Sequence, residues 1–163
     1  MSRALNDLTT RMRPLAVQLI AYITEAGIAV CIVDTLRTEA EHKANLAAGT
    51  SGTLLSKHLP LRLRWPGGAL PDDLVAADRD RSDAIDLAPY EQFQLHGPDK
   101  IRWDASDPAW LRMGEIGESF GLRWGGRWRS PRDPGHFEWF DADDPQRLQL
   151  VSDERQRPYP VRT

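Results

Sequence analysis

Apolar side chains recur at helical spacing near the start of the chain. Over residues 6–26 they return every three or four positions, which predicts an amphipathic helix. Gly27 follows this run and is well placed to end the helix, because glycine readily adopts the left-handed conformation of a C-cap. Pro14 interrupts the pattern, so the sequence predicts either a kink there or the start of a second helix.

Shorter apolar runs predict buried strands, separated by two further helices. Residues 28–33 are apolar and rich in β-branched side chains, as buried strands are. The helices are predicted over residues 38–48 and 107–120, the second with Asp107 as its N-cap and Pro108 as its first residue. Further short strands are predicted over residues 84–87, 122–124 and 136–139.

Two stretches lack this periodicity. Residues 59–83 are rich in proline, glycine and charge, which predicts a long loop with little regular structure. A loop of this length inside a compact domain is usually functional or mobile. The chain after residue 142 is polar and contains proline. We therefore expect one domain over residues 1–142 and a loosely held tail over residues 143–163.

The composition is that of a single globular domain. The 163 residues are 40% hydrophobic and 28% charged, and no apolar run approaches the roughly 20 residues of a membrane-spanning helix. The formal net charge of −3 argues against a nucleic-acid partner, which usually requires a basic excess. We expect neither a nucleic acid nor a membrane as partner, and we expect the protein to be a monomer.

The single cysteine restricts the metal chemistry of the chain. Cys31 has no second cysteine with which to form a disulfide or a Cys-rich zinc site, so any metal must be held by histidines and carboxylates. Cys31 itself lies in an apolar run and is predicted to be a small buried side chain. The first residues lack the pattern of a signal peptide, and we expect synthesis in the cytoplasm.

Two of the four histidines stand in suggestive places. His58 follows a small polar loop, and His136 comes three residues after Asp133, just before a predicted strand. Asp86 ends the short run Ser-Asp-Ala-Ile-Asp. Two imidazoles, a carboxylate and a water form the open tetrahedral site of a catalytic zinc ion, which lowers the pKa of that water toward about 7. Taken singly, each residue also has a structural interpretation, as a buried histidine or a turn aspartate.

The order of the motifs along the chain resembles a known family. Arg37 is followed by Ser-Lys-His at 56–58, Ser-Asp-Ala-Ile-Asp at 82–86, Gly-Leu-Arg-Trp-Gly-Gly-Arg-Trp at 121–128 and Asp-Pro-Gly-His-Phe-Glu at 133–138. This series resembles the M15 zinc peptidases over residues 15–140. That family includes D-alanyl-D-alanine carboxypeptidases and dipeptidases and the L-alanyl-D-glutamate endopeptidases of phage endolysins. The last two motifs are most similar to those of the L-alanyl-D-glutamate group.

The resemblance implies a role for each motif residue. It implies that His58, Asp86 and His136 bind Zn²⁺ and that Asp133 is the general base. It also implies that Arg37 holds the substrate or its oxyanion. The substrate-binding residues that it indicates are Ser56, His42 and Trp124.

Two departures from the family pattern leave alternatives open. The insertion at residues 59–83 separates His58 from Asp86, which are only a few residues apart in the common pattern. Three other acids are therefore alternative ligands, namely Asp78, Asp80 and Asp83. The family often has glutamine where this chain has His42, so a histidine on the helix surface is a second interpretation of that residue. Glu138 either orients a metal ligand or lies at a strand edge.

The elements and the resemblance together predict an α+β fold. We expect a small, mostly antiparallel sheet that carries the zinc site, with helices packed on one side, as in hedgehog and D-Ala-D-Ala peptidase domains. The predicted function is a zinc-dependent endopeptidase that cuts the peptidoglycan stem peptide between L-Ala and D-Glu. As a phage lysin it would act on the cell wall after release from the cytoplasm. The alternatives are a D-Ala-D-Ala carboxypeptidase or dipeptidase, and a zinc-retaining binding module without catalysis.

Overall fold

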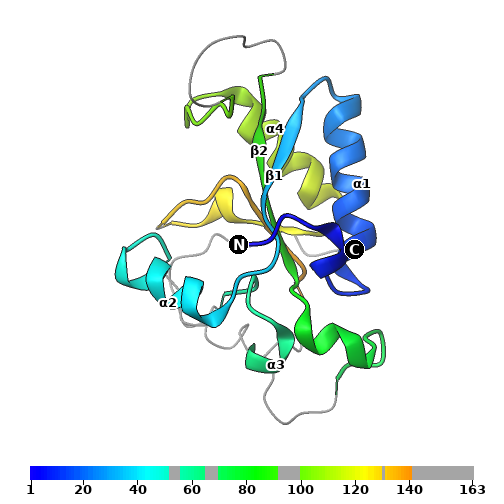
Figure 1. The fold of residues 1–163 in the computed structure, drawn as a ribbon. Coiled ribbons are helices and arrows are strands. Elements are labelled where there is room, and N and C mark those ends of the chain that lie inside the picture. Colours follow the sequence, from blue (N-terminus) through cyan, green and yellow to red (C-terminus); the bar gives the residue numbers. More distant parts are fainter. Residues whose placement is uncertain (52–55, 65–69, 92–99, 130, 141–163) are drawn as a thin grey trace.

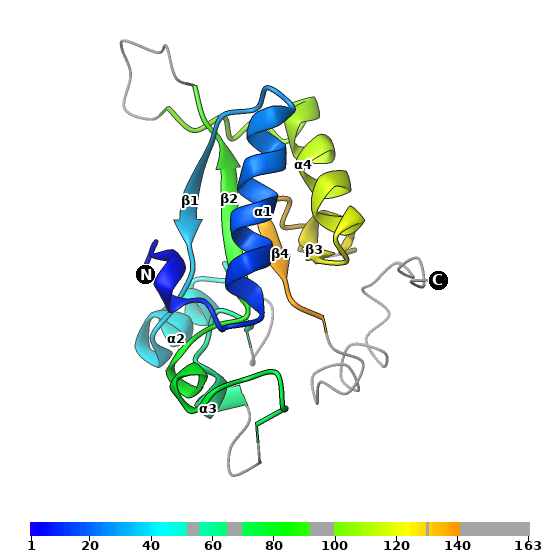
Figure 2. The ribbon, with the colours of Figure 1, turned by 90° about the vertical axis from the view of Figure 1, so that its right-hand side faces the viewer.

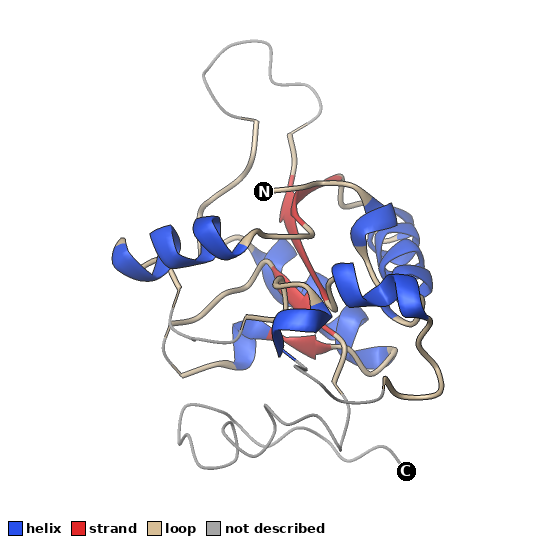
Figure 3. Cartoon of the chain, turned by 60° about the horizontal axis from the view of Figure 1, so that its bottom comes forward, coloured by secondary structure: helices blue, strands red, loops and turns tan. Residues whose placement is uncertain are grey.

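A four-stranded antiparallel sheet forms the centre of the structure. The structure is a computed structural model that describes residues 1–51, 56–64, 70–91, 100–129 and 131–140. Figure 3 shows the short strands gathered among helices and long loops. Their order across the sheet is β1 (Val30–Asp34), β2 (Ala84–Pro89), β4 (His136–Glu138) and β3 (Arg123–Trp124). The predicted α+β fold with an antiparallel sheet is confirmed.

Two long helices cover one face of this sheet. They are α1 (Met12–Glu25) and α4 (Pro108–Ser119), which lie side by side, with α1 in front of β2 in Figure 2. Both α2 (Glu39–Ala47) and α3 (Leu61–Arg64) lie at the end of the sheet where β1 finishes (Figure 1). No described helix is long and apolar enough to cross a membrane. The short 3-10 helices are η1 (Leu5–Asp7), η2 (Ala76–Asp80) and η3 (Gly125–Arg127).

The core lies between the sheet and these two helices. Ile85 and Leu87 of β2 and Phe137 of β4 are fully or almost fully buried in it. Phe137 lies so close to α4 that a Cβ atom added at Gly117 would stand 2.6 Å from its ring. The glycine therefore lets the helix approach the sheet, and Leu19 of α1 packs beside the same point.

Strand alternation places the chemically interesting side chains on the opposite face. Successive side chains of a strand point to opposite sides, so Asp86 faces away from the core that Ile85 and Leu87 fill. The antiparallel register pairs Asp86 with Asp34 of β1 on one side and with His136 of β4 on the other. Three polar residues thus form one row across three neighbouring strands.

The helix boundaries refine the predictions from the sequence. The first helix begins at Met12 and not at residue 6, because residues 5–7 form a separate 3-10 turn. Pro14 lies in the first turn of α1, where its missing N–H costs nothing. Gly27 follows the helix with φ of +80°, in keeping with the predicted C-cap.

The insertion at residues 59–83 has more structure than the sequence predicts. It contains α3 and η2, and the side chains of Leu61 and Asp78 are fully buried. The carboxylate of Asp78 accepts hydrogen bonds from the backbone N–H of Thr10 and of Val75, both at 2.9 Å. Charge in this segment therefore serves to hold it against the N-terminal residues. The predicted tail at residues 143–163 lies outside the described residues.

Asp83 is the centre of a buried ion cluster at the end of the insertion. Its Oδ2 atom accepts from Arg11 Nη2 at 2.7 Å and from Arg64 Nη2 at 3.0 Å, and Thr9 donates its hydroxyl to Oδ1. Burial alone would raise the pKa of Asp83, but the charges of Arg64 and Arg11 hold it well below its usual range. The cluster joins α1, α3 and the start of β2.

We predict that Asp83→Asn lowers the free energy of unfolding by about 3–5 kcal/mol near neutral pH, because two buried guanidinium groups lose their counter-charge. The pKa of Asp83 is lower in the folded than in the unfolded chain. Its contribution is therefore complete above the unfolded pKa of about 3.9 and is lost as the pH falls below it. Urea unfolding between about pH 3 and pH 7 should show a difference from wild type that narrows at the acid end.

Asp80→Asn is the matched control for this prediction. Asp80 also pairs with an arginine of α3, Arg62, but both side chains are largely exposed. Its removal should change the free energy of unfolding by less than about 1 kcal/mol. Equal losses in the two variants would show that the buried cluster does not stabilise the fold as described.

Candidate metal centre

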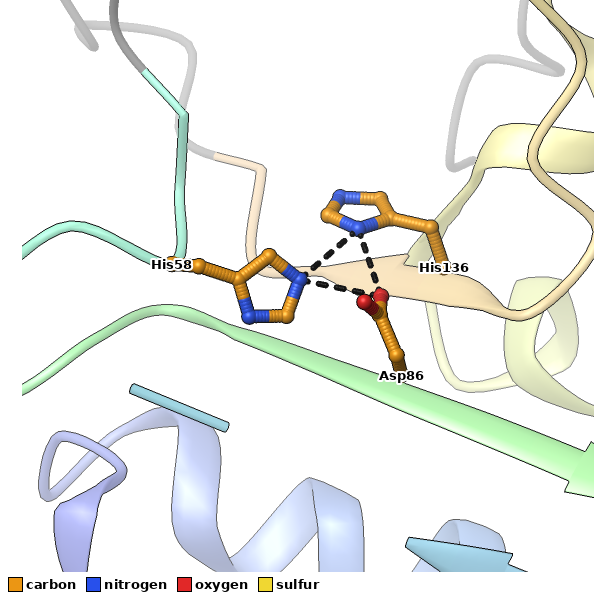
Figure 4. A group of neighbouring side chains, drawn as sticks. All are labelled: His58, Asp86 and His136. Carbon is orange, nitrogen blue, oxygen red and sulfur yellow. Dashed lines mark hydrogen bonds and ion pairs between the residues drawn. The ribbon is translucent and has the colours of Figure 1, made fainter. Parts of the chain in front are cut away.

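Three donor atoms from distant parts of the chain converge on one point. His58 Nε2 lies 2.9 Å from Asp86 Oδ1 and 3.1 Å from His136 Nδ1, and His136 Nδ1 lies 3.0 Å from the same Asp86 oxygen. Figure 4 shows the two rings meeting above the Asp86 carboxylate. His58 comes from the loop before the insertion, Asp86 from β2 and His136 from β4. The insertion therefore leaves the predicted pairing of His58 with Asp86 intact in space.

The backbone fixes which nitrogen of His58 faces this point. His58 Nδ1 lies 3.0 Å from the carbonyl oxygen of Thr35, an atom that can only accept. Nδ1 must therefore carry the proton, which leaves Nε2 with a free electron pair. Ser82 donates its hydroxyl to the same carbonyl at 2.6 Å, so the peptide that orients the ring is itself held in place.

A carboxylate fixes His136 in the complementary way. His136 Nε2 lies 2.8 Å from Glu138 Oε2, and both side chains are buried. Although burial would raise the pKa of Glu138, the charge of Arg123 and the hydrogen bond from His136 hold it at about 2. Glu138 is thus an ionised acceptor, and Nδ1 of His136 is the nitrogen turned toward Asp86.

These donors fit a tetrahedral metal ion. Ligand atoms at about 2.0–2.1 Å from a shared zinc ion stand about 3.3 Å apart. The three separations here, 2.9, 3.0 and 3.1 Å, are close to that spacing. Two imidazole nitrogens and one carboxylate oxygen also form the ligand set of open catalytic sites, in which a fourth position is left to water or substrate. The residues present therefore fit a metal ion.

In the metal-free site, His136 carries a proton on the nitrogen that would bind the metal ion. Burial would lower the pKa of His136, but hydrogen bonds to Asp86 and Glu138 raise it to about 10. Burial would raise the pKa of Asp86, but the neighbouring histidines hold it well below its usual range. The metal-free site is thus an imidazolium–carboxylate pair, and metal binding must release the proton on Nδ1.

Asp133 stands beside the three donors. Burial raises the pKa of its carboxyl and the charge of Asp86 raises it further, while His136 and His58 lower it. The loop that carries Asp133 lies close to η3, because Asp133 donates its backbone N–H to the Gly125 carbonyl at 3.2 Å. A Cβ atom at Gly125 would stand 2.4 Å from the Asp133 carbonyl oxygen, so the glycine permits this approach.

Arg37 lies on the other side of Asp86. Its Nε and Nη2 atoms donate to Asp34 Oδ2 at 3.0 and 2.6 Å, and Nη2 lies 3.7 Å from Asp86 Oδ2. Asp34 is almost fully buried and completes the polar row of the sheet. Arg37 therefore contacts the oxygen of Asp86 that does not face the two histidines.

The remaining predicted site residues have different surroundings. Ser56 is buried and its Oγ accepts from the backbone N–H of His58 at 3.3 Å, next to the site. His42 is buried, which corrects its alternative interpretation as a histidine of the helix surface. Trp124 is only 5% exposed, it packs against Gly114 and Gly126, and its Nε1 donates to the Pro134 carbonyl at 2.8 Å.

Trp124 therefore supports the loop that carries Asp133, and its predicted contact with the substrate stays a prediction. Of the alternative ligands, Asp78 and Asp83 are engaged in the contacts described above, and Asp80 pairs with Arg62. The sequence analysis did not identify Asp34 or Thr35 as parts of the site. The position of Asp34 at the end of a buried strand, directly before Thr35, was the available signal.

A comparison with protein families matches residues 81–139 to a model described as D-alanyl-D-alanine carboxypeptidase, family M15. The matched segment contains Asp86, Asp133 and His136. His58 precedes it.

A comparison with solved structures finds a similar fold in the L-Ala D-Glu endopeptidase ChiX of Serratia marcescens. The TM-score is 0.56 with 15% sequence identity, and the match covers 83% of each chain. At this identity the likeness concerns the fold. The family match over residues 81–139, the fold and the His-Asp-His cluster together support a metallopeptidase similar to those of the M15 family.

Proposed function

We propose that this protein is a zinc-dependent endopeptidase that cuts the peptidoglycan stem peptide between L-Ala and D-Glu. The observation that carries the proposal is the convergence of His58, Asp86 and His136 with Asp133 beside them. Zinc is favoured over other divalent ions because a site of two imidazoles and one carboxylate suits its tetrahedral preference. A metal bound there supplies a Lewis acid that polarises the scissile carbonyl and acidifies the attacking water.

Asp133 is the residue that moves the proton in this proposal. Its carboxyl has a raised pKa, which suits a group that must accept a proton and then release it. Asp133 takes the proton from the attacking water as the carbon–oxygen bond forms. It delivers that proton to the leaving amine as the carbon–nitrogen bond breaks. The close packing at Gly125 holds it in position for both transfers.

Arg37 is proposed to stabilise negative charge on the substrate or on the reaction intermediate. The hydrogen bonds of its guanidinium to Asp34 use Nε and Nη2. The third nitrogen of the same planar guanidinium, Nη1, is the donor that we assign to the substrate. Because the guanidinium is held by a buried carboxylate, its position is set before the substrate arrives, as electrostatic stabilisation requires.

The choice of bond rests on sequence motifs and on the specificity of the enzyme with the similar fold. The stretches at 121–128 and 133–138 resemble the L-alanyl-D-glutamate group, and the Serratia enzyme of similar fold is an L-Ala D-Glu endopeptidase. The description of the matching family favours a second candidate, a D-Ala-D-Ala carboxypeptidase. A role as a phage lysin that meets the wall after release from the cytoplasm is part of the proposal and follows from the motif resemblance.

Asp133→Asn should lower kcat by about 10²–10⁴-fold, because the amide cannot accept the proton from water. Zinc content should stay at the wild-type level, since Asp133 is not among the three donors. Hydrolysis of a synthetic stem peptide and metal analysis of the same preparations would test this. Full activity in the variant would exclude Asp133 as the general base, and inactivity of the wild type itself would favour a non-catalytic binding module.

Digestion of purified peptidoglycan should produce new amino termini on D-Glu, identified by end-group labelling and mass spectrometry. An endopeptidase of the proposed specificity leaves the D-Ala residues of the stem attached. Release of free D-Ala or of the D-Ala-D-Ala dipeptide would replace the proposal with the carboxypeptidase or dipeptidase alternative. The Asp133→Asn protein, treated identically, serves as the blank.

A further inference from the structure

Glu138 joins the metal-facing His136 to a buried arginine, Arg123. One carboxylate oxygen, Oε2, accepts from His136 Nε2 at 2.8 Å, and the other, Oε1, forms an ion pair with Arg123 Nη1 at 3.2 Å. All three residues are at most 4% exposed. At such burial, an ionised carboxylate is stable only when both of its oxygens meet positive charge or N–H donors.

The sheet register places these groups together. Arg123 of β3 is the direct cross-strand partner of Glu138 on β4, so both side chains lie on the same face. His136 is two residues before Glu138 on the same strand and therefore shares that face as well. The arrangement is built from strand positions, which hold side chains more precisely than loops do.

We propose that Glu138, braced by Arg123, is a positioning residue that fixes His136 with Nδ1 toward the metal and Nε2–H toward the protein interior. The proposal rests on the metal site described under the proposed function. Carboxylates that accept from the second nitrogen of a ligand imidazole set the ring orientation and raise its basicity as a ligand.

Glutamine at this position has a specific defect. Arg123 and His136 Nε2–H both need an acceptor, but a glutamine side chain has only one carbonyl oxygen. When that oxygen meets Arg123, the amide NH₂ group faces Nε2 and favours a proton on Nδ1. That proton occupies the atom that must bind the metal. The variant therefore weakens the metal site without changing the size of the side chain.

The test measures zinc affinity by competition with a chelator in wild type, Glu138→Gln and Glu138→Asp. We expect a dissociation constant about 10–100-fold higher for Glu138→Gln. Glu138→Asp keeps the charge but withdraws it by one methylene, and a smaller increase is expected. The Nε2–H proton resonance of zinc-loaded His136 should also move upfield in Glu138→Gln, because this N–H loses its charged acceptor.

Glu118→Gln is the matched control. Glu118 also pairs with an arginine, Arg127, at 2.8 Å, but it touches none of the three donors. Zinc affinity in this variant should equal that of wild type, and thermal melting of the metal-free proteins identifies any general loss of stability. Unchanged affinity in Glu138→Gln, or equal weakening in Glu118→Gln, would overturn the positioning role. Failure of the wild type to bind zinc would instead overturn the proposed function.

Discussion

The pairing of Asp86 with His136 in the antiparallel register of β2 and β4 is the constraint on which the site depends. A one-residue slip would turn His136 toward the core and bring Phe137 to the open face. The register is secured from the core side, because Phe137 fits against Gly117 of α4 and Ile85 and Leu87 fill the space beneath. Apolar packing on one face of the sheet therefore determines the geometry of the polar chemistry on the other.

Buried polar contacts hold the three metal-facing side chains in this arrangement. Each of the three donors has a partner on its far side: the Thr35 carbonyl for His58, Arg37 for Asp86 and Glu138 for His136. The insertion adds a second buried network around Asp83, which joins the N-terminal residues to the start of β2. Asp83 lies three positions before Asp86, so the ion cluster also anchors the strand that bears the metal-facing carboxylate.

The sequence predicted the parts of the site that lie within one short motif. Asp133 and His136 share a single turn and strand, and their spacing already indicates proximity. Partners far apart in the chain were harder to predict, because a charge in a Pro- and Gly-rich segment resembles a solvated one. Asp78 bonds to Thr10, which lies 68 residues away in the chain, and Asp83 bonds to Arg11, which lies 72 residues away. The burial of His42 depends likewise on what packs over α2, which periodicity does not encode.

The function of the site depends on whether His58, Asp86 and His136 hold one metal ion together. Metal analysis of the purified wild type beside the three single alanine variants tests this claim most directly, with Asp78→Ala as a control for loss of a buried carboxylate elsewhere. We expect stoichiometric zinc in the wild type and the control, and zinc near background in each of the three variants. Full zinc retention in Asp86→Ala would contradict this expectation and would move the carboxylate ligand to another part of the chain.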